Sequence, residues 1–455
     1  MESILSPDIN TCSTPSELKI TDMRFCDVQG LPMHCILMKI YTNQGIVGYG
    51  EVRDFASKRY ALQLKRILLG ENPCNVDKIF RRIKQFGGQS RQGGGVSGVE
   101  VALWDLAGKA YGQPVYRLLG GKFRDKIRMY CDTDVEGKHT GKDMGRALLA
   151  RMEKGYTFLK MDLGLGILKD VPGAVSAPLG FMEELPALWE KRRAAEAAGD
   201  RELARYLENR IYDYHNIAHP FTGIHVTELG FDVLEQYVKD VRETIGYEVP
   251  LAIDHFGHIG LEDSIKLCRR IEKYNLAWAE DLIPWQLTDQ YAMLRRSTTV
   301  PICTGEDIYL KENFLPLLKA GGVSVIHPDV LTAGGILELK KISDLAADYG
   351  TAMAVHMAES PIGCLAAVHA AASCENFLAL EYHSVDVPDW CDIYDDKLPK
   401  PLVQDGYITV PDLPGLGIET LNDEVLKAHI HPRIPGMWEP TDLWNEDVVE
   451  DRLWS

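Results

Sequence analysis

The chain has 455 residues, 45% of them hydrophobic, so it can bury a sizeable core, and its length suggests two or three domains. Its formal net charge of -17 excludes a general attraction to nucleic acid, which needs clustered lysine and arginine. Anionic substrates must therefore be met by a local cation or a metal ion. We expect a soluble, cytoplasmic protein with no membrane partner, because the N-terminal stretch lacks a signal pattern, no apolar run reaches the roughly 18 residues of a membrane span, and ten scattered cysteines suit a reducing compartment.

The first part of the chain predicts a small α+β domain. From residue 19 to residue 51 the pattern is two-stranded, with the apolar runs CILMKIYT and GIVGYGEV meeting at a turn over residues 43–45 that is typical of a hairpin. Helical stretches follow at residues 57–70, 75–86 and 96–112. Strands followed by helices favour a separate domain, which we place at residues 1–125.

The next part alternates short β-type runs with amphipathic helices, as a (β/α)8 barrel requires. The runs number eight and read IRMYC, YTFLKMD, VPLAID, LAWAED, VPICTGED, VSVIHPD, TAMAVHM and FLALEYH. We place this barrel at residues 126–398. The segment at residues 399–455 contains no further barrel unit, so we expect it to return to the first domain.

One interval between strands is too long for a single helix, which indicates an insertion at about residues 166–226. It contains a helical pattern and follows a strand that leads to the mouth of the barrel. We expect its helices either to cover the site, with Tyr212, Tyr214 and His215 as substrate contacts, or to contact another subunit of a homo-oligomer. A peripheral decoration is the alternative.

Acidic residues end three consecutive strands, at Asp254, Glu280 and Glu306. Because the carboxyl ends of barrel strands converge on one mouth, these carboxylates would repel each other unless a hard cation lay among them. Oxygen ligands favour Mg²⁺. A single acidic residue here would more often cap a helix, but three in register make the metal site the better interpretation.

Asp329 and His356 end the next two strands, so we expect them to be neighbours. An aspartate beside a histidine fixes its tautomer and raises its basicity, which prepares a general base. Glu381 closes the last strand and could face the substrate as a hydrogen-bond partner or as an acid. In LKMDLG, Lys160 and Asp162 point to the same face of a strand, either as a catalytic pair or as a salt bridge.

These motifs resemble the enolase superfamily, in the branch of mandelate racemase and muconate lactonising enzyme. The resemblance covers nearly the whole chain and includes GIVGYGEV, GVEVALWDLAGKAYGQPVYRLLGG, AID, WAED, TGED, HPDV, AVHMAESPIG, LEYH and DGYITVPDLPGLGI. It implies an enolase-like modified TIM barrel with an N-terminal capping domain. It also implies that residues 25–30 and 51–56 of the cap close over the substrate, which makes Asp27 a candidate substrate contact.

The resemblance also assigns roles at the mouth. It implies that the three strand-end carboxylates bind Mg²⁺, that Asp329 and His356 form the base dyad, and that Glu381 faces the carboxylate end of the substrate. Many members carry Lys-x-Lys on the second strand, with the second lysine as the opposite base. Here Lys160 matches the first lysine and Asp162 stands at the second. We expect Lys160 to lower the pKa of Asp162, so that Asp162 binds a substrate hydroxyl or holds Lys160.

The implied chemistry is abstraction of the proton alpha to a carboxylate, through an enediolate, followed by loss of a β-hydroxyl as water. With one usual base replaced, a lyase of the sugar-acid dehydratase type is the interpretation we favour, with a small carboxylate as substrate. An epimerase or racemase that uses Lys160 or His255 as its second base is one alternative, and His255 is also a candidate substrate contact. A catalytically inert regulatory relative is the other alternative.

Overall fold

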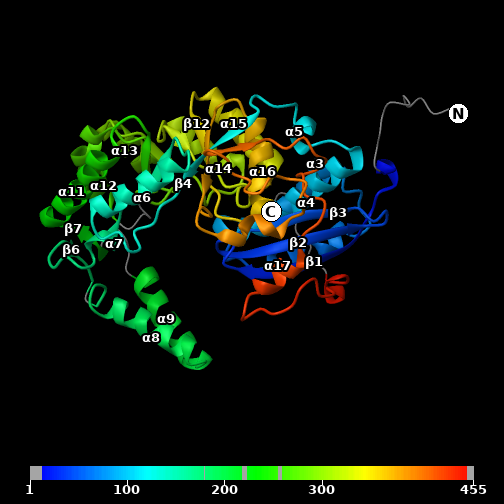
Figure 1. Cartoon of the computed structure of the whole chain (residues 1–455), viewed down its shortest axis with the longest axis horizontal. Helices are drawn as coiled ribbons and strands as arrows, with labels where there is room; N and C mark the ends of the chain where they lie inside the picture. The colour runs from blue at the N-terminus through cyan, green and yellow to red at the C-terminus, as the bar shows by residue number, and fades with distance from the viewer. Residues whose placement is uncertain (1–12, 179, 218–222, 255–258, 448–455) are drawn as a thin grey trace.

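The computed structural model describes residues 13–178, 180–217, 223–254 and 259–447. Figure 1 shows a barrel beside an N-terminal cap that holds the first three strands. Within the part of the chain that the structure describes, no helix is both long enough and apolar enough to cross a membrane.

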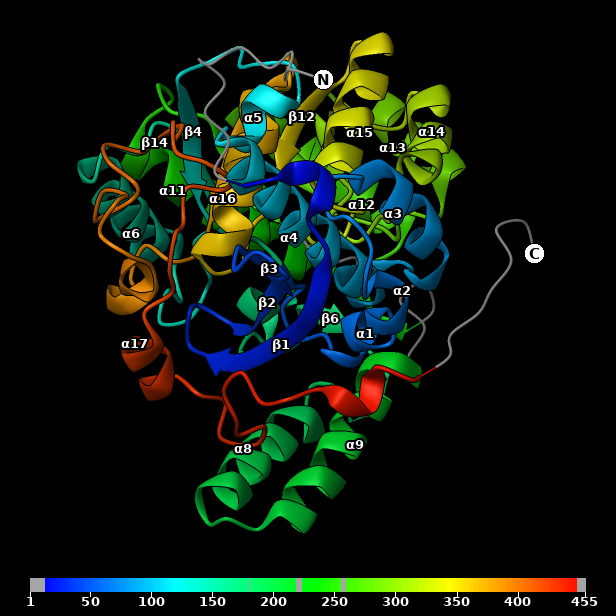
Figure 2. The same ribbon diagram turned by 90° about the vertical axis from the view of Figure 1, so that its right-hand side faces the viewer.

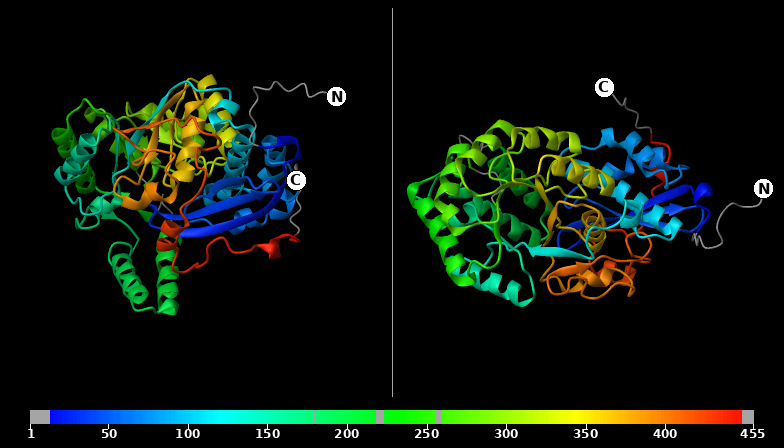
Figure 3. Two further views of the ribbon diagram at one scale, coloured as in Figure 1. Left: turned by 45° about the vertical axis from the view of Figure 1, so that its right-hand side comes forward. Right: turned by 90° about the horizontal axis from the view of Figure 1, so that it is seen from above.

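Eight parallel strands form a closed barrel, which confirms the predicted (β/α)8 fold (Figure 3). They pair in the order β4 (Lys126–Cys131), β5 (Leu159–Asp162), β8 (Leu251–Asp254), β9 (Ala279–Glu280), β10 (Ile302–Thr304), β11 (Val325–Ile326), β12 (Ala352–Val355) and β13 (Phe377–Tyr382). Strand β13 then pairs with β4 to close the ring. Tyr130, Phe158 and Trp278 fill the interior, so the barrel is a packed core and its chemistry lies at the strand ends.

Amphipathic helices surround the barrel. They are α6 (Gly141–Glu153), α11 (Glu228–Ile245), α12 (Leu261–Ile271), α13 (Thr288–Ser297), α14 (Lys311–Ala320), α15 (Ile336–Asp348) and α16 (Pro361–Ala372). Helix α11 is typical: the Thr227 hydroxyl caps its first turn by accepting from the Gly230 N–H, and Phe231 and Leu234 are buried on its inner face. Helix α16 is buried along its whole length, because it lies between barrel strands and the cap.

The cap contains a three-stranded antiparallel sheet of β1 (Ile20–Gln29), β2 (His34–Thr42) and β3 (Val47–Val52). Strands β2 and β3 form the predicted hairpin, whose turn places Gly45 at a φ of +77°. The two-stranded expectation for this region is wrong, because β1 is a third strand. Charged residues interrupt the apolar pattern of β1. Arg24 Nε lies 2.7 Å from Asp22 Oδ2 on that strand.

Helices cover this sheet, namely α1 (Arg59–Leu62), α2 (Lys65–Leu68), α3 (Val76–Ile83), α4 (Gly94–Tyr111) and α5 (Val115–Leu118). Helix α4 approaches β3 closely: a Cβ atom on Gly50 would lie 2.3 Å from the Gly98 carbonyl oxygen. Glycine is therefore required at this crossing. Short 3-10 helices lie at η1 (Pro15–Glu17), η2 (Lys84–Phe86), η3 (Ser90–Gly93), η4 (Glu272–Tyr274), η5 (Pro388–Ile393) and η6 (Asp442–Trp444).

Two buried glutamates attach the cap to the barrel helices. Glu51 on β3 accepts hydrogen bonds from the backbone N–H of Ser360 and of Gly363, both at 3.1 Å, at the start of α16. Glu100 on α4 accepts from the N–H of Ile336 at 2.7 Å and of Leu337 at 3.0 Å, at the start of α15. Carboxylates stabilise helix N-termini, so Glu100 replaces the missing cap of α15, whereas Glu51 adds to the cap that Ser360 provides at α16.

The C-terminal segment returns to the cap. Strand β14 (Tyr407–Thr409) pairs antiparallel with β4, and helix α17 (Asp423–Ala428) follows. Further on, isolated bridges join Val28 to Ile430 and Cys26 to Met437. The segment therefore adds backbone hydrogen bonds along β1.

The insertion contains α7 (Leu165–Leu168), the short strands β6 (Val175–Ser176) and β7 (His225–Val226), and a hairpin of α8 (Glu184–Ala197) and α9 (Arg201–Ile217). Figures 1 and 2 show this hairpin projecting from the rest of the molecule. Its two helices share a small apolar seam, and Glu196 on α8 pairs with Arg433 of the C-terminal segment. Tyr214 donates to Glu184 at 2.6 Å within the hairpin, whereas the side chain of His215 lies outside the described residues.

Candidate active site

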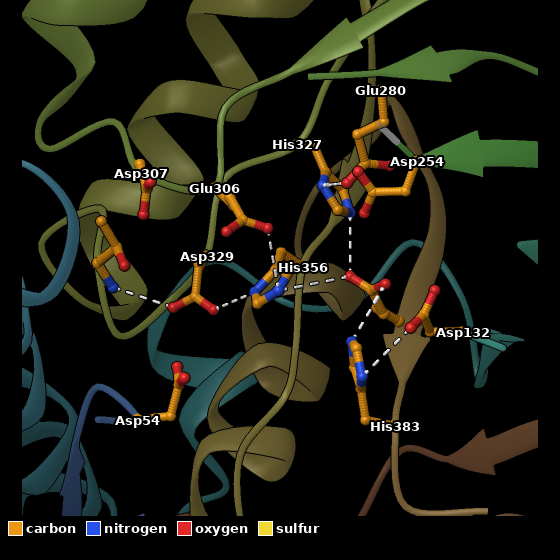
Figure 4. Close-up of polar contacts among 12 residues, drawn as sticks. Asp54, Asp132, Asp254, Glu280, Glu306, Asp307, His327, Asp329, His356 and His383 are labelled. Atoms are coloured by element: carbon orange, nitrogen blue, oxygen red, sulfur yellow. Dashed lines mark hydrogen bonds and ion pairs between the residues drawn. The ribbon is translucent and has the colours of Figure 1, made fainter. Parts of the chain in front are cut away.

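The structure brings Asp329 and His356 together at the mouth of the barrel (Figure 4). His356 Nδ1 lies 2.7 Å from Asp329 Oδ2. The backbone N–H groups of Leu331 and Thr332 donate to the other aspartate oxygen at 2.6 and 3.0 Å. Because the aspartate is fixed in this way, it favours a proton on Nδ1 and leaves Nε2 to face the mouth.

Arg53, which directly follows β3 in the cap, contacts both members of this dyad. Its buried guanidinium contacts Asp329, and Nη1 lies 2.9 Å from His356 Nδ1. The same Nη1 is 3.1 Å from Glu359 Oε1, and Nε is 2.8 Å from Asp54 Oδ1. Burial opposes ionisation of Asp329, but the charges of Arg53 and His356 lower its pKa below the usual value. The cap thus supplies the cation that keeps this aspartate ionised.

Lys160 lies among four carboxylates. Its Nζ is 2.6 Å from Glu381, 2.9 Å from Asp254, 3.2 Å from Glu280 and 3.8 Å from Asp132. Although burial alone would lower the pKa of Lys160, these charges raise it well above the usual value. The alternative in which Lys160 is the second base would require a neutral lysine, whereas these contacts favour its charged form.

Asp162 differs from the sequence expectation in its partners and in its pKa. None of the ion pairs among the described residues joins it to Lys160, and its Oδ1 is buried without a hydrogen-bond partner. Its pKa is raised to about 8, first by burial and then by the charge of Asp132, and the opposing effect of Lys160 is smaller. The expected lowering of this pKa is therefore wrong. The spacing of the two residues indicated the attraction of Lys160 but not the burial of Asp162. Burial has the larger effect on the pKa of Asp162.

The three expected metal ligands lie around the same space, and each already contacts a basic side chain of the protein. Lys160 pairs with both Asp254 and Glu280, as described above, and Glu306 lies 3.2 Å from His356 Nε2. The carboxylate oxygens that come within 4.8 Å of one another belong to Glu280, Asp281 and Glu306. Asp281, which directly follows β9, was not among the expected ligands.

These oxygens fit a divalent cation. Asp254 Oδ1 is buried without a hydrogen-bond partner. Burial and the neighbouring charges of Glu280, Asp281 and Glu306 raise the pKa of Asp254 well above its usual value, so its ionised form lacks sufficient counter-charge in the protein alone. An all-carboxylate set of this kind suits hard cations such as Mg²⁺.

Glu381 lies at the centre of a charged group. Besides Lys160 it is close to His356, His327 and His383, with nitrogen to oxygen distances of 3.8, 3.5 and 3.4 Å. Burial opposes ionisation, but Lys160 and the histidines lower the pKa of Glu381 well below its usual value. These contacts favour the carboxylate form of Glu381, and so a hydrogen-bond acceptor over the alternative role as an acid.

Two further histidines, which sequence reasoning missed, reach the mouth. His327 lies 2.9 Å from Glu280 Oε1 and 2.5 Å from the Tyr130 hydroxyl, and it is fully buried. His383 directly follows β13 and lies beside Asp132, which directly follows β4 (Figure 4). A signal for His383, Asp132 and Asp281 was present, because each stands at a strand end. The expected cap segment at residues 51–56 includes Arg53, but nothing in the sequence pattern singled out this residue.

The candidate substrate contact Asp27 lies in the cap, among partners of its own. Both oxygens of Asp27 are taken, one by His34 Nε2 at 3.1 Å and the other by Lys58 Nζ at 2.7 Å, and the residue is buried in the cap. These partners and burial occupy its polar atoms, so the structure does not present Asp27 to a substrate. His255 lies outside the described residues.

Comparison with known proteins agrees with this geometry, since acid–base groups at the C-terminal mouth of a barrel are typical of enzymes. Residues 20–120 match the family model described as mandelate racemase / muconate lactonizing enzyme, N-terminal domain, and residues 143–425 match the model described as enolase C-terminal domain-like. The chain belongs to the enolase superfamily, in the branch of mandelate racemase and muconate lactonizing enzyme.

Two of the similar proteins are named dehydratases, which are hydro-lyases. The chain is 32% identical to a D-xylonate dehydratase of Haloferax volcanii over 91% of this chain and 89% of that protein. It is 27% identical to a D-galactonate dehydratase of Ralstonia pickettii over 90% and 94%. Among solved structures, a mandelate racemase/muconate lactonizing enzyme-like protein from Rubrobacter xylanophilus matches with a TM-score of 0.74 and 29% identity, over 92% of this chain and 99% of that chain.

Proposed function

We propose that this protein is a Mg²⁺-dependent sugar-acid dehydratase. It would take the proton alpha to the substrate carboxylate, pass through an enediolate and lose the β-hydroxyl as water, giving a 2-keto-3-deoxy acid. The observation that carries the proposal is the Asp329–His356 dyad, whose Nε2 faces the carboxylate group at the mouth. The dehydratase names of the similar proteins support the same reaction class.

The residues of the chain would divide the work as follows. Asp254, Glu280 and Glu306 would hold the metal ion, which when bound would draw electron density from the substrate carboxylate. His356 Nε2 would take the alpha proton, while Asp329 keeps the ring oriented. Lys160 would stay charged and stabilise negative charge that develops on the substrate. Glu381 would accept a hydrogen bond from the substrate.

The direct test is a panel of five- and six-carbon sugar acids, including D-xylonate and D-galactonate, incubated with the protein and Mg²⁺. We expect a 2-keto-3-deoxy product from at least one acid, and no product after treatment with a chelator. Solvent deuterium at the alpha carbon without any loss of water would instead indicate an epimerase or racemase. Absence of both exchange and product across the panel would leave the inert regulatory relative.

The epimerase alternative is favoured by one observation, the raised pKa of Asp162. An aspartate with a pKa of about 8 exchanges protons near neutral pH, as a second acid–base group must. We nevertheless expect Asp162 to bind a substrate hydroxyl, because a protonated carboxyl donates a hydrogen bond well.

Asp162→Asn should therefore raise KM while it keeps alpha-proton exchange on the face served by His356. The stereochemistry of deuterium incorporation, followed by NMR in wild type and variant, checks this expectation. Exchange on both faces in wild type, with one face lost in the variant, would make Asp162 a base and move the epimerase ahead of the dehydratase.

The projecting hairpin of α8 and α9 is proposed to contact another subunit of a homo-oligomer. Leu203 and Tyr206 on α9 are 44% and 61% exposed, and large apolar side chains on a projecting element are typical of contact surfaces. Replacing residues 184–217 by a short glycine–serine linker should reduce the particle mass measured by light scattering or raise KM. Arg433→Ala, which removes only the pair with Glu196, serves as the control. Unchanged mass, KM and kcat after the deletion would make the hairpin a peripheral decoration.

We also propose that the protein works in the cytoplasm. Every cysteine that the structure describes is free, and most of them are buried, which suits a reducing compartment. The cap, through the loop that carries Arg53, is proposed to select among sugar acids. The boundaries at residues 125 and 398 remain predictions from the sequence.

A further inference from the structure

The mouth contains a second histidine–aspartate pair whose place mirrors the first. His383 follows β13 and Asp132 follows β4, and these strands are neighbours because their pairing closes the barrel. His383 Nδ1 lies 3.5 Å from Asp132 Oδ2, and the Asp132 N–H donates to the Tyr382 carbonyl at 3.3 Å. The dehydratase roles proposed above leave this pair without a function.

Both histidines approach one carboxylate. His356 Nε2 lies 3.8 Å from one oxygen of Glu381, and His383 Nε2 lies 3.4 Å from the other. The ring centroids of the two histidines are 6.0 Å apart (Figure 4). His383 Nε2 is buried without a hydrogen-bond partner, although its side chain remains 19% exposed. Its contact with Glu381 is an ion pair and not a formed hydrogen bond, so this nitrogen can still donate to a ligand.

Dehydration needs two proton transfers at adjacent carbon atoms. A base removes the alpha proton, and the hydroxyl on the next carbon is a poor leaving group unless it receives a proton. His356 supplies the base. Two imidazole rings with centroids 6.0 Å apart at one mouth could act on adjacent carbon atoms of one substrate, and each ring lies beside its own aspartate.

We infer that His383 is the general acid that protonates the leaving β-hydroxyl, with Asp132 as its positioning residue. The inference rests on the proposed dehydration. The alpha C–H bond breaks as His356 gains the proton, and its electron pair enters the enediolate. That pair then forms the C=C bond while the C–O bond breaks, and the oxygen leaves as water with the proton of His383. Solvent returns one proton to His383 and removes one from His356.

The charge environment is consistent with an acid. Burial alone would lower the pKa of His383, but the charges of Asp132 and Glu381 raise it to about 9. The ring therefore carries a proton at neutral pH. The two carboxylates contact different ring nitrogens, Asp132 lying 3.5 Å from Nδ1 and Glu381 3.4 Å from Nε2.

The test compares two leaving groups. His383→Asn and Asp132→Asn are assayed with a sugar acid that the wild type dehydrates and with its 3-deoxy-3-fluoro analogue, because fluoride leaves without a proton. His383→Asn should lower kcat for water loss by roughly 10²–10⁴-fold. It should leave fluoride loss and alpha-deuterium exchange close to wild type. Asp132→Asn should move the same ratio of water loss to fluoride loss in the same direction.

The exposed His225, which lies 3.5 Å from Asp263, offers a matched control, and His225→Asn should change neither rate. Retained exchange shows that the variant site is folded. Equal loss of both leaving groups, loss of exchange, or unchanged water loss in His383→Asn would overturn the inference while leaving the dehydratase in place. If the wild type releases neither water nor fluoride from any acid of the panel, the proposed function and the inference fall together.

Discussion

Replacing His356 with asparagine should lower kcat by roughly 10²–10⁴-fold, the usual contribution of a positioned base. Asparagine keeps a polar side chain beside Asp329, so the hydrogen bond at 2.7 Å can be replaced, but it cannot accept the alpha proton. Alpha-deuterium exchange should fall with turnover, because both depend on the same proton transfer. Steady-state kinetics and NMR exchange on the same preparation measure the two losses.

His225→Asn is again the matched control, since it removes a histidine from an aspartate outside the mouth. Mg²⁺ affinity measured by calorimetry should stay within a few-fold of wild type in both variants. Activity in the His356→Asn protein would show that another group is the base. Parallel loss of metal binding would show that the side chain acts through Glu306, which lies 3.2 Å from its Nε2.

Asp254→Asn should weaken Mg²⁺ binding and abolish turnover. The loss of affinity should exceed the 10–100-fold that removal of an outer-shell partner typically costs, because a direct charged ligand is neutralised. Asp254 has a buried oxygen without a hydrogen-bond partner, and burial and the neighbouring carboxylates raise its pKa well above the usual value. Titration calorimetry with Mg²⁺ alone, without substrate, measures the effect separately from activity.

Asp281→Asn is the informative companion, because its carboxylate oxygen lies within 4.8 Å of those of Glu280 and Glu306. We expect this variant to keep most of its Mg²⁺ affinity. The reverse result, with binding lost in Asp281→Asn and kept in Asp254→Asn, would replace Asp254 by Asp281 in the ligand set. A structure with bound Mg²⁺ should show distances of about 2.0–2.1 Å to one oxygen of each true ligand.

The sequence predicts much of this architecture because strand ends in a barrel obey simple geometry. Each β-type run that ends in Asp, Glu or His delivers that residue to the mouth, and consecutive runs deliver neighbours. Asp329 and His356 could therefore be paired without a structure. The same rule reaches Asp132 and His383 once the closing contact between the first and last strands is considered.

Other features depend on contacts that no local pattern contains. Arg53 reaches the dyad from a different domain, and its partner Asp329 is far away in the sequence. The pKa of Asp162 is set mainly by burial, which outweighs the attraction of Lys160 that spacing suggested. Lys160 itself is shared among residues on several strands, so its partners follow from barrel closure and not from its neighbours in the chain.

The attachment of the cap through Glu51 and Glu100 limits how specificity can be re-engineered. These side chains cap the helices that follow β11 and β12, the strands that precede the two members of the dyad. A chimaera with the cap of a relative must place a carboxylate at the start of both helices. Otherwise the first N–H groups of α15 and α16 will be buried under the new cap without the acceptors that Glu51 and Glu100 provide. Exchange of the loops alone, with β3 and α4 retained, avoids this penalty and is the safer route to a new substrate.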